Sequence, residues 1–195
     1  MTLLIRTIVL ATLTALITGS TPTRAQISPR RQAFFNQHVD LLRAVQETGV
    51  STYINPRICF ENKGPKYNGM YRPMGHGTMV ICQQGATPQD EGKEVGWTDE
   101  DLDTLRHESH HLVQDCMGGV KGDLQLVPVF ATRDGLESFI LGVLTQEEVD
   151  WITTTYSSVG ATDEVIWLEI ETFAVARAVD AGTIAQAVRQ QCKIN

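Results

Sequence analysis

The chain contains 195 residues, of which 42% are hydrophobic, and this is enough to build one domain with a buried core. It carries 23 acidic and 16 basic residues, so its net charge is −7 at neutral pH. An acidic surface repels phosphate groups, which argues against a nucleic acid as the partner. The sequence contains no internal repeat, low-complexity run or linker that would indicate a second domain.

Residues 1–25 have the pattern of a secretory signal peptide. A short start with Arg6 precedes an apolar run at residues 7–17, and a polar segment ends at Ala25, after which we expect cleavage. The apolar run is short for a bilayer, and no later segment is long and apolar enough to cross one, so we expect no membrane insertion after cleavage. The expected mature protein is one domain at residues 26–195, either secreted or periplasmic.

Four cysteines remain in the expected mature chain, and an even number in an exported protein indicates disulfide bonds. Of the possible pairings we favour Cys59–Cys82, which closes a local loop. The other two would then pair as Cys116–Cys192 and tie the end of the chain to the end of a predicted helix. A cysteine metal site is the weaker interpretation, because the sequence contains no Cys-x-x-Cys pair.

The first predicted element is a helix with Ser28 as its N-cap and Pro29 at its first position, and it ends before Gly49. His38 lies on the apolar stripe of this helix and is expected to be packed rather than to bind a ligand. Short apolar runs broken by Gly, Pro and Asn follow. They predict strands at residues 50–54, 57–60, 70–72 and 78–82.

The next helix is predicted at residues 99–117. Thr98 can cap its N-terminus, three acidic residues occupy its first turn, and Gly118 provides a stop. Apolar residues recur at helical spacing, so one face can be buried. These residues are Leu102, Leu105, Leu112 and Val113.

This helix contains a His-Glu-x-x-His motif formed by His107, Glu108 and His111. The two histidines lie one turn apart on one face, where their imidazole nitrogens can hold one Zn²⁺. Glu108 lies beside them and can take a proton from a water that the metal activates. His110 lies less well on the helix face that His107 and His111 share, so we do not expect it in the metal site. The motif resembles that of the zincin class of zinc-dependent peptidases.

The resemblance implies an α+β fold in which a small mixed sheet packs on the motif helix. It also implies that an extended substrate can pair with an edge strand of the sheet. Residues 75–82 are the candidate for this strand, and an ordinary hairpin is the alternative for the same residues.

The C-terminal half is expected to be mainly helical. The predicted elements are an extended segment at residues 124–131, a short apolar segment at 136–144, a helix capped by Thr145 that reaches Tyr156, a helix at 163–180 capped by Thr162, and a last helix capped by Thr183.

A catalytic zinc usually has three protein ligands and one position for water. In the gluzincin group, which this pattern resembles, the third ligand is a glutamate on a later helix, and the helix at residues 163–180 offers Glu169 and Glu171. We favour Glu171, because it lies in an apolar arc where a carboxylate must be paired or bind a metal. Glu169 lies in a polar arc and is the alternative, and both could instead be solvated. An Asp is often found four residues after this ligand. Here that position is Val175 for Glu171 and Phe173 for Glu169.

Five further side chains are candidates for supporting roles, and each also fits an ordinary packing or surface role. Glu137 could be the third ligand instead. Gln114 or Asp115 could orient an imidazole. His76 and Tyr156 could donate hydrogen bonds to a developing oxyanion.

These observations predict a secreted zinc metallopeptidase that hydrolyses a peptide or protein substrate, with Glu108 as the general base. Two interpretations from other classes remain open. One is an exported zinc-binding or interaction module without turnover, and the other is a disulfide-stabilised structural domain. Hydrolysis of a bond other than a peptide bond is also compatible with zinc chemistry.

Overall fold

The structure, a computed structural model, describes residues 28–61, 68–119 and 121–192. The predicted signal peptide at residues 1–25 lies outside the described residues. Within them the chain forms six α-helices, two short 3₁₀-helices and one three-stranded mixed sheet. The predicted α+β class with a small mixed sheet is therefore confirmed.

The sheet consists of β1 (Ser51–Ile54), β2 (Gly69–Arg72) and β3 (Thr78–Ile81). Their order is β1-β3-β2, and β3 runs parallel to β1 and antiparallel to β2. Three of the predicted strands are confirmed, but the strand predicted at residues 57–60 is wrong. That segment is the 3₁₀-helix η1 (Arg57–Phe60), because the chain turns at Pro56, whose carbonyl accepts a hydrogen bond from the N–H of Cys59 (2.9 Å).

The edge-strand prediction for residues 75–82 is also wrong. The strand in this segment, β3, lies in the centre of the sheet and is paired on both sides. A central strand has no free backbone edge that a substrate could pair with. Among the described strands, β1 and β2 are the outer ones and could offer such an edge.

The first two helices have the ends that their capping residues predict. In α1 (Pro29–Glu47) the side chain of Ser28 accepts a hydrogen bond from the third residue that follows. In α2 (Asp99–Met117) Thr98 and Asp101 form a capping box, and the four predicted apolar positions are buried. His38 is packed as expected. Its Nδ1 faces the carbonyl of Phe34 and its Nε2 accepts a hydrogen bond from Arg106, both at 2.8 Å.

The C-terminal half is mainly helical, as predicted. It contains α3 (Arg133–Val143), α4 (Gln146–Ser158), α5 (Asp163–Ala178) and α6 (Ala181–Gln191). The segment at residues 124–131 is not a strand. The cap of the last helix was predicted wrongly: Asp180 caps α6, because its carboxylate accepts hydrogen bonds from both the N–H and the hydroxyl of Thr183. No helix in the described ranges is long and apolar enough to cross a membrane.

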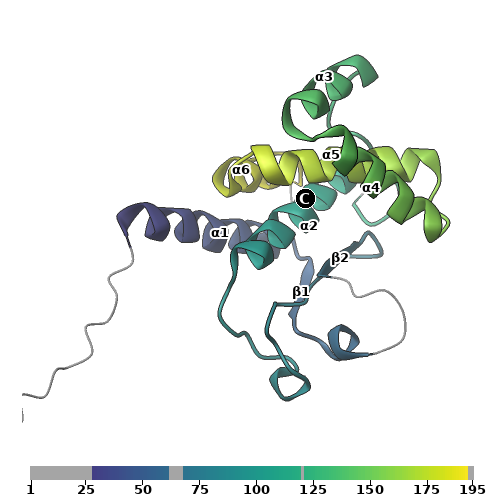
Figure 1. Cartoon of the computed structure of the whole chain (residues 1–195). Helices are drawn as coiled ribbons and strands as arrows, with labels where there is room; N and C mark the ends of the chain where they lie inside the picture. The colour runs from purple at the N-terminus through teal and green to yellow at the C-terminus, as the bar shows by residue number, and fades with distance from the viewer. Residues whose placement is uncertain (1–27, 62–67, 120, 193–195) are drawn as a thin grey trace, which may run out of the picture.

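The helix α2 lies between the sheet and the C-terminal helices (Figure 1). It contacts β2 and β3 on one side and α5 and α6 on the other, and α1 packs against α6. One hydrophobic core joins the sheet with α1, α2 and α6, and a second joins α3, α4 and α5. The buried position of α2 fixes the side chains of its motif between two layers.

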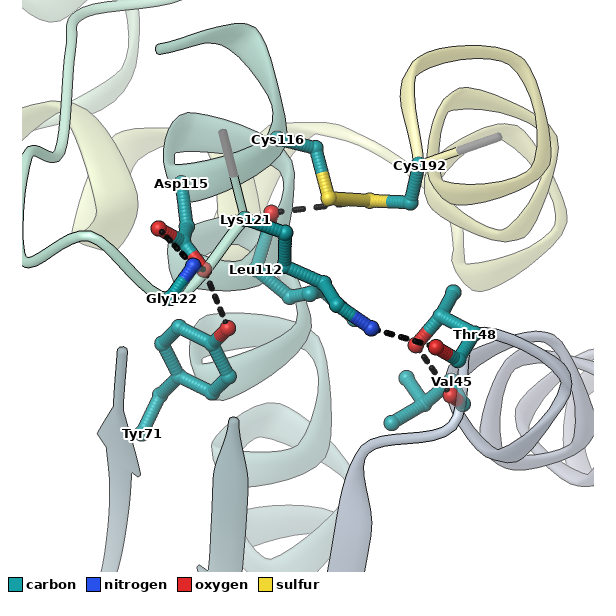
Figure 2. The surroundings of a disulfide bond; sticks show 9 residues. All are labelled: Val45, Thr48, Tyr71, Leu112, Asp115, Cys116, Lys121, Gly122 and Cys192. Atoms are coloured by element: carbon teal, nitrogen blue, oxygen red, sulfur yellow. Dashed lines mark hydrogen bonds between the residues drawn. A yellow bond between two sulfur atoms is a disulfide. The ribbon is translucent and has the colours of Figure 1, made fainter. Parts of the chain in front are cut away.

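Both predicted disulfide pairings, Cys59–Cys82 and Cys116–Cys192, are confirmed. The second joins the last residues of α2 to the end of α6 (Figure 2). In the same region the hydroxyl of Tyr71 on β2 donates a hydrogen bond to the carboxylate of Asp115 (2.6 Å). The C-terminal end of α2 is therefore attached both to the sheet and to the last helix, which holds the motif helix in a fixed orientation.

Candidate metal centre

The structure brings the two motif histidines together with Glu169 of α5. The Nε2 atoms of His107 and His111 lie 3.2 Å apart. The carboxylate of Glu169 faces both rings, with Oε2 3.3 Å from Nε2 of His107 and Oε1 3.4 Å from Nε2 of His111. In a tetrahedral zinc site with bonds of about 2.0–2.1 Å, neighbouring ligand atoms are separated by about 3.4 Å. The spacing of these nitrogen and oxygen atoms therefore fits one metal ion.

Glu108 lies next to this pair of histidines. One ligand atom each from His107, Glu108 and His111 can be chosen so that all lie within 4.8 Å of one another, and this group could hold a metal ion. The predicted pairing of the two histidines with a neighbouring Glu108 is thus present in the folded chain.

Glu171, which the sequence favoured over Glu169 as the third ligand, has other partners in the structure. Glu171 is fully buried, and its Oε1 accepts hydrogen bonds from Nε2 of His110 (2.9 Å), Nε2 of Gln114 (3.1 Å) and the N–H of Val129 (2.9 Å). A buried carboxylate needs partners, and N–H donors satisfy that need as well as a metal does. The apolar arc therefore predicted correctly that Glu171 is buried but not which partner it has.

The imidazole of His111 is held by a side chain that the sequence had suggested. Oε1 of Gln114 lies 2.8 Å from Nδ1 of His111, so in the neutral ring Nδ1 carries the proton and Nε2 has its lone pair for a ligand. Asp115, the other suggested partner, does not contact the imidazole in this way. Its carboxylate accepts hydrogen bonds from Tyr71 and from the N–H of Gly122.

Glu108 is almost completely buried, with 5% of its surface exposed. Burial raises the pKa of its carboxyl group to about 7, although the backbone N–H of Tyr71 on β2 lowers it in part. The strand β2 comes this close because it has a glycine here: a Cβ on Gly69 would lie 2.8 Å from Oε1 of Glu108. The outer strand of the sheet thus lies directly against the predicted general base.

The charges of His107, His111 and Glu169 strongly affect one another. Burial alone would raise the pKa of Glu169, but hydrogen bonds with His107 and His111 outweigh it and hold the pKa well below its usual range. Burial lowers the pKa of His107 to about 4. Burial also disfavours the charged form of His111, yet the carboxylate of Glu169 outweighs it and raises the pKa to about 9. The cluster therefore attracts one positive charge at neutral pH.

The other candidates from the sequence have different partners. Glu137 is exposed on α3 and forms an ion pair with Arg133, so it does not provide the third ligand. His76 is exposed in the turn between β2 and β3. Tyr156 is partly buried on α4 and packs against the second hydrophobic core.

Two aromatic residues next to the cluster were missed as site residues. The ring of Phe173 packs edge-on against His107, with centroids 4.6 Å apart, and Trp151 of α4 packs against Phe173 at 6.0 Å. The indole is 58% exposed. One signal was available in the sequence, because Phe173 lies one turn after Glu169 on the same helix. An apolar wall thus extends from His107 to the surface.

Comparison of the chain with protein-family models, with curated proteins and with solved structures finds no significant match. The geometry of the side chains is therefore the basis for a functional proposal.

Proposed function

We propose that this protein is an exported zinc-dependent peptidase in which His107, His111 and Glu169 hold the metal. The observation that carries the proposal is the set of 3.2–3.4 Å separations between the two Nε2 atoms and the carboxylate oxygens. When both rings are neutral and protonated on Nδ1, these atoms are all acceptors that face one another. A cation between them would satisfy all of their lone pairs. Two imidazoles with one carboxylate are a donor set typical of catalytic zinc.

When bound, the metal supplies Lewis acidity, which lowers the pKa of a water toward neutrality and polarises a carbonyl group. Glu108 accepts the proton of the attacking water and then passes it to the leaving amine. A pKa of about 7 suits both steps, because such a carboxylate takes up and releases a proton near neutral pH. In the neutral His111 ring that metal binding requires, Nε2 has the lone pair, because Gln114 accepts the hydrogen bond from Nδ1.

The surroundings of the cluster suit a polypeptide substrate. An extended peptide can add to the outer strand β2, which lies against Glu108, through backbone hydrogen bonds with little demand on side chains. On another side, Phe173 and the exposed Trp151 offer an apolar surface next to His107. We therefore expect peptides with a large apolar side chain near the scissile bond to be preferred.

Replacing Glu108 with Gln tests the proposal, because it removes the base and keeps the size of the side chain. We expect kcat for an unstructured protein such as casein to fall about 10²- to 10⁴-fold. The zinc content, measured on purified protein, should stay near one per chain. The control is Glu147→Gln, since Glu147 is exposed on α4. Full activity of the Glu108→Gln variant would remove Glu108 from the role of general base.

The same measurements separate the competing classes. A wild-type protein that holds zinc but cleaves none of a mixed peptide library would be a binding or interaction module. A wild-type protein that takes up no zinc would be a disulfide-stabilised structural domain. Cleavage that stops on addition of a chelator and returns with zinc would support the peptidase.

A further inference from the structure

The carboxylate of Glu171 contacts His110 and Gln114 and is not one of the proposed metal ligands. It is fully buried, and three N–H donors converge on its Oε1 while its Oε2 has no hydrogen-bond partner among the described residues. Burial alone raises the pKa of this group, but hydrogen bonds from His110, Val129 and Gln114 outweigh it and lower the pKa. Because three N–H donors converge on its Oε1, Glu171 acts as a hydrogen-bond acceptor at this place.

An acceptor-only group at this place decides how the amide of Gln114 is oriented. The amide nitrogen of Gln114 donates to Oε1 of Glu171 (3.1 Å) and to the carbonyl of Leu168 (3.2 Å). Two acceptors on one side leave only the amide oxygen to face the other side, where Nδ1 of His111 lies at 2.8 Å. The amide oxygen needs a donor, so Nδ1 of His111 must carry the proton.

We propose that Glu171 is a positioning residue that sets the zinc affinity of the cluster by acting through Gln114 on His111. The chain of contacts fixes the tautomer in which Nε2 of His111 is unprotonated and faces Glu169. Without Glu171 only the carbonyl of Leu168 still accepts from the amide nitrogen of Gln114. The amide can then turn over more readily and present its nitrogen to the imidazole, which favours the wrong tautomer. The inference rests on the proposed metal site but does not require that the protein cleaves peptides.

The alternative is that Glu171 only stabilises the fold, since it also holds His110 and the backbone of Val129. Both roles predict a loss of stability when Glu171 is replaced, so stability alone does not separate them. They differ in metal binding. A positioning role predicts that the effect on zinc affinity depends on the presence of Gln114.

A double-mutant cycle on zinc affinity tests this dependence. The variants are Glu171→Met, Gln114→Met and the double variant, and the affinity for zinc alone is measured by competition with a chromophoric chelator. We expect each single variant to lose about 10- to 100-fold in affinity. The double variant should bind zinc as well as Gln114→Met does. Losses that multiply in the double variant, or a Gln114→Met variant with wild-type affinity, would overturn the proposal.

An isosteric variant keeps the test decisive if Glu171→Met does not fold. Glu171→Gln can keep an oxygen at the position of Oε1 and so can still accept from Gln114. We expect its zinc affinity to stay within about threefold of wild type, well short of the loss expected from removing such a partner. A loss of more than tenfold would mean that the negative charge, not the orientation of the amide, is what matters, and it would overturn the proposal.

Two further measurements complete the design. In ¹⁵N-edited spectra of the zinc-loaded protein, His111 should carry its proton on Nδ1 in wild type and in Glu171→Gln, and a proton on Nε2 instead would overturn the proposal. Glu137→Met, on the exposed side of α3, is the matched control and should bind zinc as wild type does. If wild-type protein binds no zinc, the metal site itself fails. If wild type binds zinc and the variants do too, only the positioning role fails.

Discussion

Two sets of side chains at the contact of α2 with α5 contain the same kinds of groups but differ in their balance of donors and acceptors. The outer set consists of His107, His111 and Glu169, and the inner set consists of His110, Gln114 and Glu171. In the inner set each buried N–H has an acceptor, and three donors meet on one carboxylate oxygen. In the outer set two ring nitrogens and two carboxylate oxygens face one another at 3.2–3.4 Å.

This difference separates a structural carboxylate from one that can bind a metal. In the inner set three N–H donors already occupy one oxygen of Glu171, so this set can support the fold without an added group. The outer set has more acceptors than donors and attracts either a proton or a metal cation. Burial of a glutamate therefore does not by itself indicate a metal ligand. The useful criterion is whether N–H donors already occupy its lone pairs.

The largest expected effect comes from removing the carboxylate of the outer set. Glu169→Ala leaves two imidazoles as protein ligands, so we expect the zinc content after dialysis to fall from near one per chain to near zero. Glu147→Ala, on the exposed surface of α4, should keep its zinc. Metal analysis of the two proteins purified side by side measures the effect. Retention of zinc by Glu169→Ala would exclude it as a ligand.

The inner set should also contribute to the stability of the metal-free protein. Glu171→Ala leaves three buried N–H donors without their acceptor, and each costs about 1–3 kcal/mol. We expect the free energy of unfolding in urea to fall by at least about 3 kcal/mol. Glu137→Ala removes only an exposed pair with Arg133, so its cost should stay below about 1 kcal/mol. Equal costs for the two variants would contradict the structural role of the inner set.

A third prediction concerns the approach of β2 to Glu108, which lies next to the outer set. A Cβ at position 69 would lie 2.5 Å from Cγ2 of Thr104 and 2.8 Å from Oε1 of Glu108. Gly69→Ala should therefore push the strand from the helix and cost about 1–3 kcal/mol in unfolding free energy. It should also lower kcat by displacing Glu108. Gly142→Ala is the control, because nothing lies within 4 Å of its Cβ and alanine favours a helix, so it should be neutral or stabilising.

The smallest expected effect is the release of a proton from the outer set when zinc binds. Without metal the pKa of His111 is raised to about 9 and that of His107 is lowered to about 4, so at pH 8 one of the two rings is charged. Zinc needs both rings neutral, and its binding at pH 8 should release close to one proton. The zinc affinity should then fall about tenfold for each pH unit below about 9. Calorimetry in buffers of different ionisation enthalpy counts the protons, and a count of zero or two would contradict this charge distribution.

Much of the site and of the local structure could be predicted from the sequence, because local spacing determines it. Thr98 and Gly118 define the ends of α2, and the motif spacing places His107 and His111 on one face of it. Four cysteines with no Cys-x-x-Cys pair correctly indicated disulfides, and both favoured pairings are present. In each case the signal lies within a few residues or in a small set of alternatives.

The tertiary structure alone decided which glutamate faces the histidines. Glu169 and Glu171 lie on one helix, and a helical wheel gives their directions but not the angle at which α5 crosses α2. That angle brings Glu169 to the two imidazoles and leaves Glu171 to His110, Gln114 and the N–H of Val129. Likewise, the order of the strands places β3 in the centre and β2 against Glu108. These facts depend on contacts between segments distant in the chain, for which no local pattern exists.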